Sequence, residues 1–197
     1  KKMKRIQLLV LSIVLVLAYN CKDAKKVEKE GQAETDKAVE KITEEANVEV
    51  IKFSMEPKSD SNVQGEVIFT VENGTVSMKA TLSGLSPGEH AIHIHEKADC
   101  SSDDGKSSGG HWNPTHEPHG KWGAAEGFHK GDIGNFTADA DGNAVVEFST
   151  DQWCIGCEDA NKDILGKAVI VHQGFDDFTS QPSGAAGASV SCTGIIE

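Results

Sequence analysis

The stretch Val67–Leu82, VIFTVENGTVSMKATL, contains two runs in which every second residue is apolar, one on each side of Asn73-Gly74. Apolar residues at alternate positions are typical of a strand with one buried face. Asn-Gly is the dipeptide that a tight two-residue turn between antiparallel strands favours. This stretch therefore predicts a β-hairpin.

The rest of the chain from about residue 48 onward indicates an all-β domain. Glycine is frequent, with 20 residues, and aromatic residues make up only 6%. This composition fits a domain of strands and turns better than a helical core. The Asp139–Gly142 stretch predicts another turn. Further strands are predicted at residues 91–95, 144–148, 167–172 and 189–196.

The first twenty residues are predicted to be a secretory signal. Four basic residues precede an apolar run over residues 6–18, which is short for a transmembrane helix. The run ends at Ala18-Tyr19-Asn20-Cys21, which resembles the end of a bacterial lipoprotein signal. We expect Cys21 to be acylated and to anchor the protein to a membrane; a plain secretory signal is the alternative. Both place the protein in the cell envelope, in the periplasm or on the outer surface.

Residues 21–47 are almost wholly charged or small and predict a flexible tether, because they cannot bury enough apolar surface to offset the entropy of ordering. Residues 48–197 are then one domain. The formal net charge of -12 makes the phosphate backbone of a nucleic acid an unlikely partner.

Of the five cysteines, Cys21 is assigned to the lipid, which leaves an even set that can form disulfides outside the cytoplasm. Four cysteines allow three pairings. Cys154 and Cys157 form a Cys-x-x-Cys pair, for which we expect a local disulfide. A redox-active or metal-binding dithiol is the alternative.

A long segment rich in Gly, Ser, Pro and Asp separates His95 from Ile133, and it contains four of the eight histidines. Long segments without secondary structure in a small domain are usually functional or disordered. Just before it, His93 and His95 stand two apart on a predicted strand, so both imidazoles project from one face. Imidazoles together with a carboxylate suit zinc and copper rather than calcium or magnesium.

The segments HIHEKADC, GGHWNP, PHG, FHKGDIGN, VIVHQGFDD and QPSGAAGASVSC resemble, in this order, the motifs of copper–zinc superoxide dismutases of the bacterial secreted type. The resemblance covers roughly residues 47–197. It implies an eight-stranded antiparallel Greek-key barrel with long metal-binding loops. It also implies copper and zinc as cofactors and the dismutation of superoxide to oxygen and hydrogen peroxide.

The resemblance implies a role for several side chains of these motifs. Copper is expected at His93, His95, His111 and His172. Zinc is expected at His111, His119, His129 and Asp132. His111 would bridge the two metals and act as the catalytic proton donor, and Asp176 would tie a copper ligand to a zinc ligand. Cys100 and Cys192 would form the disulfide that links the metal loop to the last strand.

The sequence departs from the family where an arginine is expected beside copper. Ser189 stands at that position, and the only arginine of the chain is Arg5. Without a docking cation for superoxide, we expect a slowed dismutase. Candidate steering charges in the metal loop are Lys97, Lys106, Lys121 and Lys130.

Two alternatives to a dismutase follow from the same residues. The first is a weakly catalytic or non-catalytic copper- and zinc-binding lipoprotein, which the missing arginine favours. The second is a copper chaperone, for which Cys154 and Cys157 are the only candidate site. His90 and His116 are interpreted as structural or solvated histidines. The sequence leaves both a monomer and a homodimer open, with Trp112, Trp122 and Trp153 as loop aromatics that a dimer contact would use if exposed.

Overall fold

The structure is a computed structural model that describes residues 49–196, and the predicted signal peptide, Cys21 and the predicted tether lie outside them. The described residues form eight strands and one short 3-10 helix, η1 (Lys106–Ser108). None of their helices is long and apolar enough to cross a membrane. The strands are β1 (Glu49–Pro57), β2 (Gln64–Glu72), β3 (Thr75–Ser83), β4 (Gly88–His95), β5 (Gly134–Ala138), β6 (Ala144–Thr150), β7 (Ala168–His172) and β8 (Ser189–Gly194).

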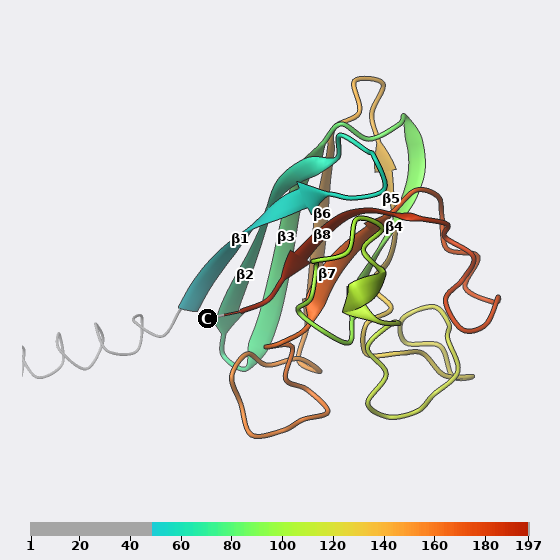
Figure 1. Cartoon of the computed structure of the whole chain (residues 1–197). Coiled ribbons are helices and arrows are strands. Elements are labelled where there is room, and N and C mark those ends of the chain that lie inside the picture. Colours follow the sequence, from blue (N-terminus) through green and yellow to red (C-terminus); the bar gives the residue numbers. More distant parts are fainter. Residues whose placement is uncertain (1–48, 197) are drawn as a thin grey trace, which may run out of the picture. The chain divides into compact units, whose positions relative to one another are not determined.

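The strands form one antiparallel sheet in the order β5-β4-β7-β8-β1-β2-β3-β6. The sheet curls so that its two edge strands, β5 and β6, approach each other without pairing, which gives a nearly closed barrel (Figure 1). β3 pairs with β6 and β4 pairs with β7, so the chain crosses between non-consecutive strands as a Greek key requires. The predicted eight-stranded all-β fold is confirmed.

The predicted hairpin is formed by β2 and β3. Val71 lies opposite Val76, and the two turn residues between the strands, Asn73 and Gly74, have φ of 50° and 77°. Positive φ at both positions is the geometry that twists with the flanking strands and that Asn-Gly adopts readily. The alternate apolar side chains of both strands are buried in the main core.

The barrel leaves its long loops together beside β4 and β7. The loop from residue 96 to 133 and the loop from residue 173 to 188 cover the face of these strands that is turned away from the core (Figure 1). Backbone hydrogen bonds join the first loop to β4, where the N–H of Trp112 donates to the carbonyl of Ile94 at 2.8 Å. The fold therefore places the outer face of β4 and β7 beneath two long loops.

Candidate metal centre

Strands β4 and β7 bring three histidines to the loop-covered face. In β4, Ile92 and Ile94 are buried in the barrel core, so His93 and His95 point the opposite way. β4 pairs with β7, whose last residue is His172. All three imidazoles are buried, because the loops close over them.

Backbone pairing holds His111 against the end of β4. His95 and His111 form an isolated antiparallel bridge. The N–H of Trp112 donates to the carbonyl of Ile94 at 2.8 Å, and the N–H of Ile94 donates to the carbonyl of Gly131 at 2.9 Å. A Cβ on Gly131 would collide with the Ile94 carbonyl, so this close approach requires glycine.

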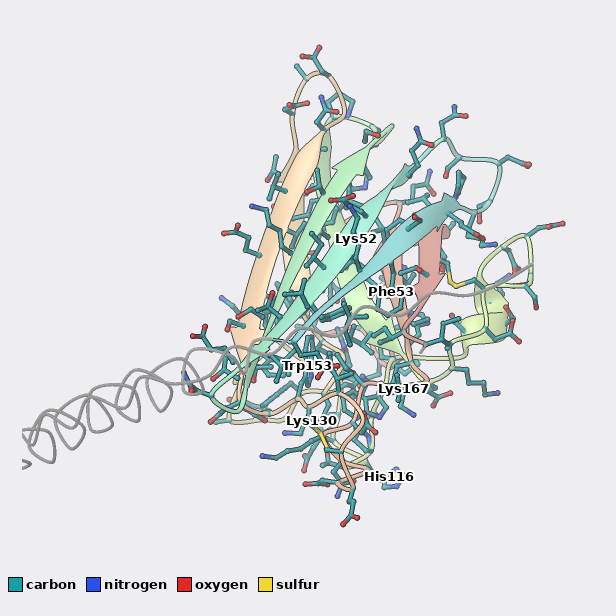
Figure 2. All side chains as sticks on the ribbon, turned by 90° about the vertical axis from the view of Figure 1, so that its left-hand side faces the viewer. Lys52, Phe53, His116, Lys130, Trp153 and Lys167 are labelled. Carbon is teal, nitrogen blue, oxygen red and sulfur yellow. A yellow bond between two sulfur atoms is a disulfide. The ribbon has the colours of Figure 1, made fainter. Side chains whose placement is uncertain are left out.

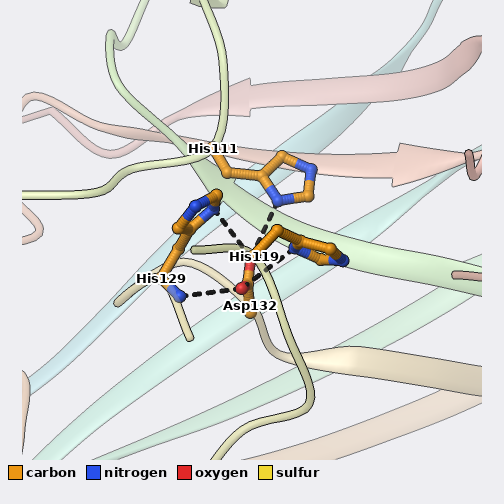
Figure 3. Close-up of side chains that lie close together, drawn as sticks. All are labelled: His111, His119, His129 and Asp132. Atoms are coloured by element: carbon orange, nitrogen blue, oxygen red, sulfur yellow. Dashed lines mark hydrogen bonds and ion pairs between the residues drawn. The ribbon is translucent and has the colours of Figure 1, made fainter. Parts of the chain in front are cut away.

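Three histidines surround one carboxylate in the loop between β4 and β5 (Figure 3). Oδ1 of Asp132 lies 2.8 Å from Nδ1 of His111 and 3.3 Å from Nδ1 of His129. Oδ2 of Asp132 lies 3.0 Å from Nδ1 of His119 and accepts the backbone N–H of His129 at 2.8 Å. One donor atom from each residue lies within 4.8 Å of the others. We call these four residues, His111, His119, His129 and Asp132, the mixed cluster.

A second group of buried rings shares His111 with the mixed cluster. One nitrogen from each of His93, His111 and His172 lies within 4.8 Å of the other two. The ring centroid of His95 lies 5.2 Å from that of His111 and 5.5 Å from that of His172. We call the four residues His93, His95, His111 and His172 the imidazole cluster.

Each ring of the two clusters has one buried nitrogen without a hydrogen-bond partner among the described residues. The second nitrogen of His93 contacts Asp176 at 2.9 Å, and that of His95 contacts the carbonyl of Gly109 at 2.8 Å. Nδ1 of His119 and His129 approaches Asp132 without hydrogen-bond geometry. The unpartnered atoms are Nδ1 of His93, His119 and His129 and Nε2 of His95, His111 and His172. Buried polar atoms are rarely left unsatisfied, so this group of atoms marks a binding site.

Asp176 connects the two clusters. Its Oδ2 contacts Nε2 of His93 and its Oδ1 contacts Nε2 of His119, both at 2.9 Å. Asn135 donates to the carbonyl of Asp176 at 2.8 Å and accepts its N–H at 2.7 Å. Gly184, with φ of 70°, leaves the space that Asp176 occupies, because a Cβ there would collide with Oδ1. The sequence pointed to Asp176 but gave no sign of Asn135 or Gly184 as its supports.

The two clusters differ in charge. Burial, together with repulsion from neighbouring rings, lowers the pKa of His93, His95 and His172 to about 3. Their rings are therefore neutral at pH 7, with lone pairs available. Burial would raise the pKa of Asp132, but hydrogen bonds from Nδ1 of His111 and the backbone N–H of His129, together with the close contacts of the His119 and His129 rings, lower it well below its usual range, so the carboxylate is ionised.

The donor atoms fit two different metal ions. Four neutral imidazole nitrogens suit Cu(II), which prefers nitrogen ligands. Three imidazoles and one carboxylate suit Zn²⁺, which is commonly bound by four such ligands in a tetrahedral arrangement. In His111, Nδ1 faces Asp132 and Nε2 is the unpartnered atom, so one ring presents a nitrogen to each cluster.

Comparison with known proteins agrees with this geometry. Residues 63–196 match the profile of the family described as copper/zinc superoxide dismutase (SODC). The chain belongs to the copper/zinc superoxide dismutase family. A superoxide dismutase [Cu-Zn] 2 of Aquifex aeolicus is 36% identical over 156 residues, which cover 73% of this chain and 89% of the relative. A superoxide dismutase [Cu-Zn] of Caulobacter vibrioides is 37% identical over 142 residues, covering 70% and 80%.

Among solved structures, the SOD-like protein from Bacillus subtilis is similar to this chain, with a TM-score of 0.65 and 28% sequence identity. The match covers 73% of this chain and 97% of the Bacillus protein. Copper and zinc, the metals of the copper/zinc superoxide dismutase family, are thus the ions that the two clusters fit.

In this member of the superoxide dismutase family, a cleft of about 580 Å³ opens onto the imidazole cluster. His95, His111 and His172 line it, and so does Ser189. Ser189 is the first residue of β8 and pairs with His172 across the β7–β8 ladder. Ser189, at which the sequence resemblance implied an arginine, is therefore next to a histidine of the imidazole cluster, and it carries no charge.

Of the four candidate steering lysines, only Lys106 lines the cleft. Its Nζ lies 2.8 Å from a carboxylate oxygen of Asp104, which also lines the cleft, as does Glu96. Lys130 instead donates to Gln152. The cleft mouth therefore has more carboxylates than ammonium groups.

Residues 49–196 contain two disulfides. Cys100 is joined to Cys192 of β8, across 92 residues of sequence. Cys154 is joined to Cys157 in the loop between β6 and β7. The first disulfide ties the loop that carries His111 to the central strand beside β7. The second closes a short local loop.

The two remaining histidines have different surroundings. His90 is buried in β4, where Nδ1 contacts the carbonyl of His172 at 2.9 Å and Nε2 contacts the carbonyl of Ser86 at 2.8 Å. It supports the backbone at the imidazole cluster. His116 is exposed on the loop between His111 and His119, at the periphery of the molecule (Figure 2).

Two of the three loop tryptophans are buried and therefore do not offer the exposed aromatic surface that a dimer contact would use. Trp112 and Trp153 are 4% and 1% exposed. Nε1 of Trp153 donates to the carbonyl of Lys130 at 2.8 Å, and its ring packs against Phe148 and Trp122. These rings extend the barrel core beneath the loops, which is why they are buried although they lie outside the strands.

Proposed function

We propose that this protein dismutates superoxide to oxygen and hydrogen peroxide in the cell envelope. Copper would be held by the imidazole cluster and zinc by the mixed cluster, with His111 as a ligand of both. The observation that carries this proposal is the set of six buried ring nitrogens without partners, arranged in two groups that share one ring. A site for a single metal would have no use for the second nitrogen of His111.

The chain's own groups provide orientation and a proton. Bound copper supplies the one-electron redox chemistry, in which one superoxide is oxidised to oxygen and the next is reduced to peroxide. Asp132 orients the ring of His111 through Nδ1, and Asp176 fixes His93 and His119 through Nε2. Nε2 of His111 would carry one of the two protons of hydrogen peroxide to the departing anion, and water would supply the other, so His111 would be the catalytic proton donor.

The rate should be lower than that of a homologue with an arginine at position 189. A charge-assisted hydrogen bond to an anion contributes about 1.5–3 kcal/mol. Its absence corresponds to a rate reduced about 10- to 100-fold. The carboxylates of Glu96 and Asp104 at the cleft further oppose the approach of an anion.

The same features support one alternative, a copper- and zinc-binding lipoprotein with little or no turnover. Ser189 and the acidic mouth favour it, because storage of metal needs no anion site. The bridging position of His111 and the support of Asp176 favour the dismutase, because a metal store gains nothing from one ring between two different ions.

The rate of superoxide loss per bound copper, followed by stopped flow, separates the two functions. Ser189→Arg should raise it about tenfold or more, whereas Ser54→Arg on the exposed face of β1 adds the same charge far from the cleft and should leave it nearly unchanged. Native protein with both metals bound but no turnover, and a Ser189→Arg variant that is equally inactive, would establish the metal-binding alternative.

The location in the envelope rests on the sequence before the domain and on the disulfides. Two disulfides in one small domain are stable outside the cytoplasm and rare within it. We expect labelled palmitate to be incorporated into the full chain in a bacterial host, and Cys21→Ala to abolish the label and release the protein from membranes. Incorporation that survives Cys21→Ala would contradict a lipid at this cysteine.

A further inference from the structure

The wall of the copper cleft contains an uncharged position next to His172. Ser189 is half-buried, pairs with His172 and lines the cleft, so a cation here would face an anion bound near the imidazole cluster. The one ammonium group in the lining, that of Lys106, is paired with Asp104 and its side chain is 83% exposed.

Lys58 is placed against the same wall from the neighbouring strand. It follows the end of β1, and its N–H donates to the carbonyl of Val190 at 3.0 Å, one residue after Ser189. The point that a Cβ on Gly105 would occupy lies 3.7 Å from Cγ of Lys58 and 3.4 Å from Oγ of Ser189. Gly105 and Ser189 line the cleft, whereas Lys58 lines the outer depression on the other side of the same segment, so its charge acts on the cleft from close by rather than as part of the lining.

The ammonium group of Lys58 has one fixed partner, and that partner is a carbonyl. Nζ donates to the carbonyl of Cys100 at 2.5 Å in a half-buried position. Cys100 is anchored to β8 by its disulfide with Cys192, so the acceptor is held in place. Among residues 49–196, no carboxylate lies within 4.0 Å of Nζ, although Asp103 and Asp104 line the outer depression that Lys58 also lines.

This arrangement leaves the charge of Lys58 available. An ammonium group has three N–H donors, of which the Cys100 carbonyl takes one. Lysine is a point charge on a flexible stem, so it attracts an anion without the two-pronged geometry of arginine. A partly desolvated positive charge without an ion pair raises the local concentration of anions more than a paired, exposed one does.

We propose that Lys58 is the positioning residue for anions in the copper cleft and that it partly replaces the cation absent at Ser189. The inference rests on the proposed copper site, and it names the residue on which anion affinity depends. Lys106, although it lies at the mouth, contributes little, because Asp104 neutralises it.

The test measures the affinity of azide for the full chain loaded with copper and zinc, from the change in the Cu(II) absorption spectrum. We expect Lys58→Met to raise the azide Kd about 3- to 10-fold and Lys58→Arg to keep it at or below the native value. Lys52→Met removes the same charge from an exposed, ion-paired lysine on β1 and should change the Kd by less than about twofold. Lys106→Met should also have little effect.

Metal content and thermal midpoint, recorded for every variant, show whether a change in Kd reflects the charge or a damaged site. If the Lys58→Met variant is not stably loaded, the Lys58→Gln variant replaces it, because its amide can still donate to the Cys100 carbonyl. An unchanged azide Kd in a fully loaded neutral variant would overturn the proposal, and so would an equal rise in Lys106→Met.

The azide titration is independent of turnover. If azide affinity depends on Lys58 but the loaded protein does not dismutate superoxide, the proposed function fails and this inference stands. If the protein dismutates superoxide rapidly and Lys58→Met changes neither azide affinity nor the salt dependence of the rate, only this inference fails.

Discussion

The mixed cluster and the imidazole cluster share His111, but they are organised by different forces. In the mixed cluster, one ionised carboxylate contacts three rings, so contacts among the four residues hold the cluster together. In the imidazole cluster, neutral rings turn their free nitrogens toward one another, and outward contacts with Asp176 and backbone carbonyls fix them. Contacts among its own residues hold the mixed cluster together, whereas contacts with surrounding residues fix the imidazole cluster.

Because of this difference, we expect the mixed cluster and the imidazole cluster to lose their structure under different conditions. A group of neutral buried histidines is sensitive to protons, because each proton adds a charge that burial and neighbouring rings disfavour. A group built on a carboxylate is sensitive to the loss of that one charge. Asp176, which touches a ring in each half, is the element through which damage to one half reaches the other.

The largest effect we expect is an acid limit set by the imidazole cluster. The pKa of His93, His95 and His172 in the folded, metal-free protein is lowered to about 3, below the value of about 6.5 in the unfolded chain. Between these values the unfolded chain binds more protons, so stability falls as pH falls. Each histidine contributes a slope of at most about 1.4 kcal/mol per pH unit, enough to unfold the metal-free protein near pH 4.

His119 of the mixed cluster should set a limit of the opposite sign, at alkaline pH. Burial lowers the pKa of His119, but the carboxylates of Asp132 and Asp176 raise it to about 9. Its contribution is fully present below about pH 6.5 and is lost as pH rises through about 9.

Urea unfolding of the metal-free protein over a pH series measures both limits. We expect His172→Gln to make the acid limb less steep by about one proton, and His119→Gln to flatten the alkaline limb only. Equal acid limbs in the native protein and the His172→Gln variant would contradict the difference drawn between the clusters.

The next effect concerns the carboxylate of the mixed cluster. Asp132→Asn keeps the size of the side chain but removes the charge that three histidines contact. We expect the zinc affinity to fall by about two to three orders of magnitude, or about 3–4 kcal/mol, because an anionic ligand is replaced by a neutral one. Copper affinity should change far less, because all donors of the imidazole cluster remain. Competition titrations of both metals with chelators measure the two affinities, and an equal loss of copper and zinc would show that the halves are not separable in this way.

The sequence predicted those features that depend on residues close together along the chain. The hairpin at Asn73-Gly74 and the shared face of His93 and His95 follow from alternation within a few residues, and both were predicted. β1 was not predicted as a separate strand, since only Met55 in it is fully buried and its alternation is weak. β5 has the sequence GNFTA, in which glycine and alanine take the buried positions, so it shows no clear alternation of large apolar side chains.

The supports of the site could not be predicted, because they come from segments far apart in sequence. Asn135 holds the backbone of Asp176 from 41 residues away, and Lys58 reaches the carbonyl of Cys100 across 42 residues. Neither residue type is unusual at a strand end or in a loop. The sequence showed that a cation was missing at Ser189, but only the pairing of β1 with β8 shows which lysine lies beside that position.

The smallest effect we expect tests the connection between the clusters with two glycines of one loop. Gly184 and Gly187 have φ of 70° and 82°, so alanine strains the backbone at both, by about 1 kcal/mol or more. They differ in the space around them. A Cβ at Gly184 would meet Asp176 and lie 2.7 Å from Nε2 of His119, whereas the nearest atom to a Cβ at Gly187 is 3.7 Å away.

Gly184→Ala should therefore displace Asp176 and weaken copper and zinc together, each about tenfold, in addition to the stability loss that it shares with Gly187→Ala. Gly187→Ala should leave both metal affinities within about twofold of the native values. If Gly184→Ala weakened only zinc, His119 would be the sole side chain affected and Asp176 would not couple the halves. A loss of affinity for both metals in Gly184→Ala, absent from the Gly187→Ala control, would show that Asp176 couples the geometry of the mixed cluster to that of the imidazole cluster.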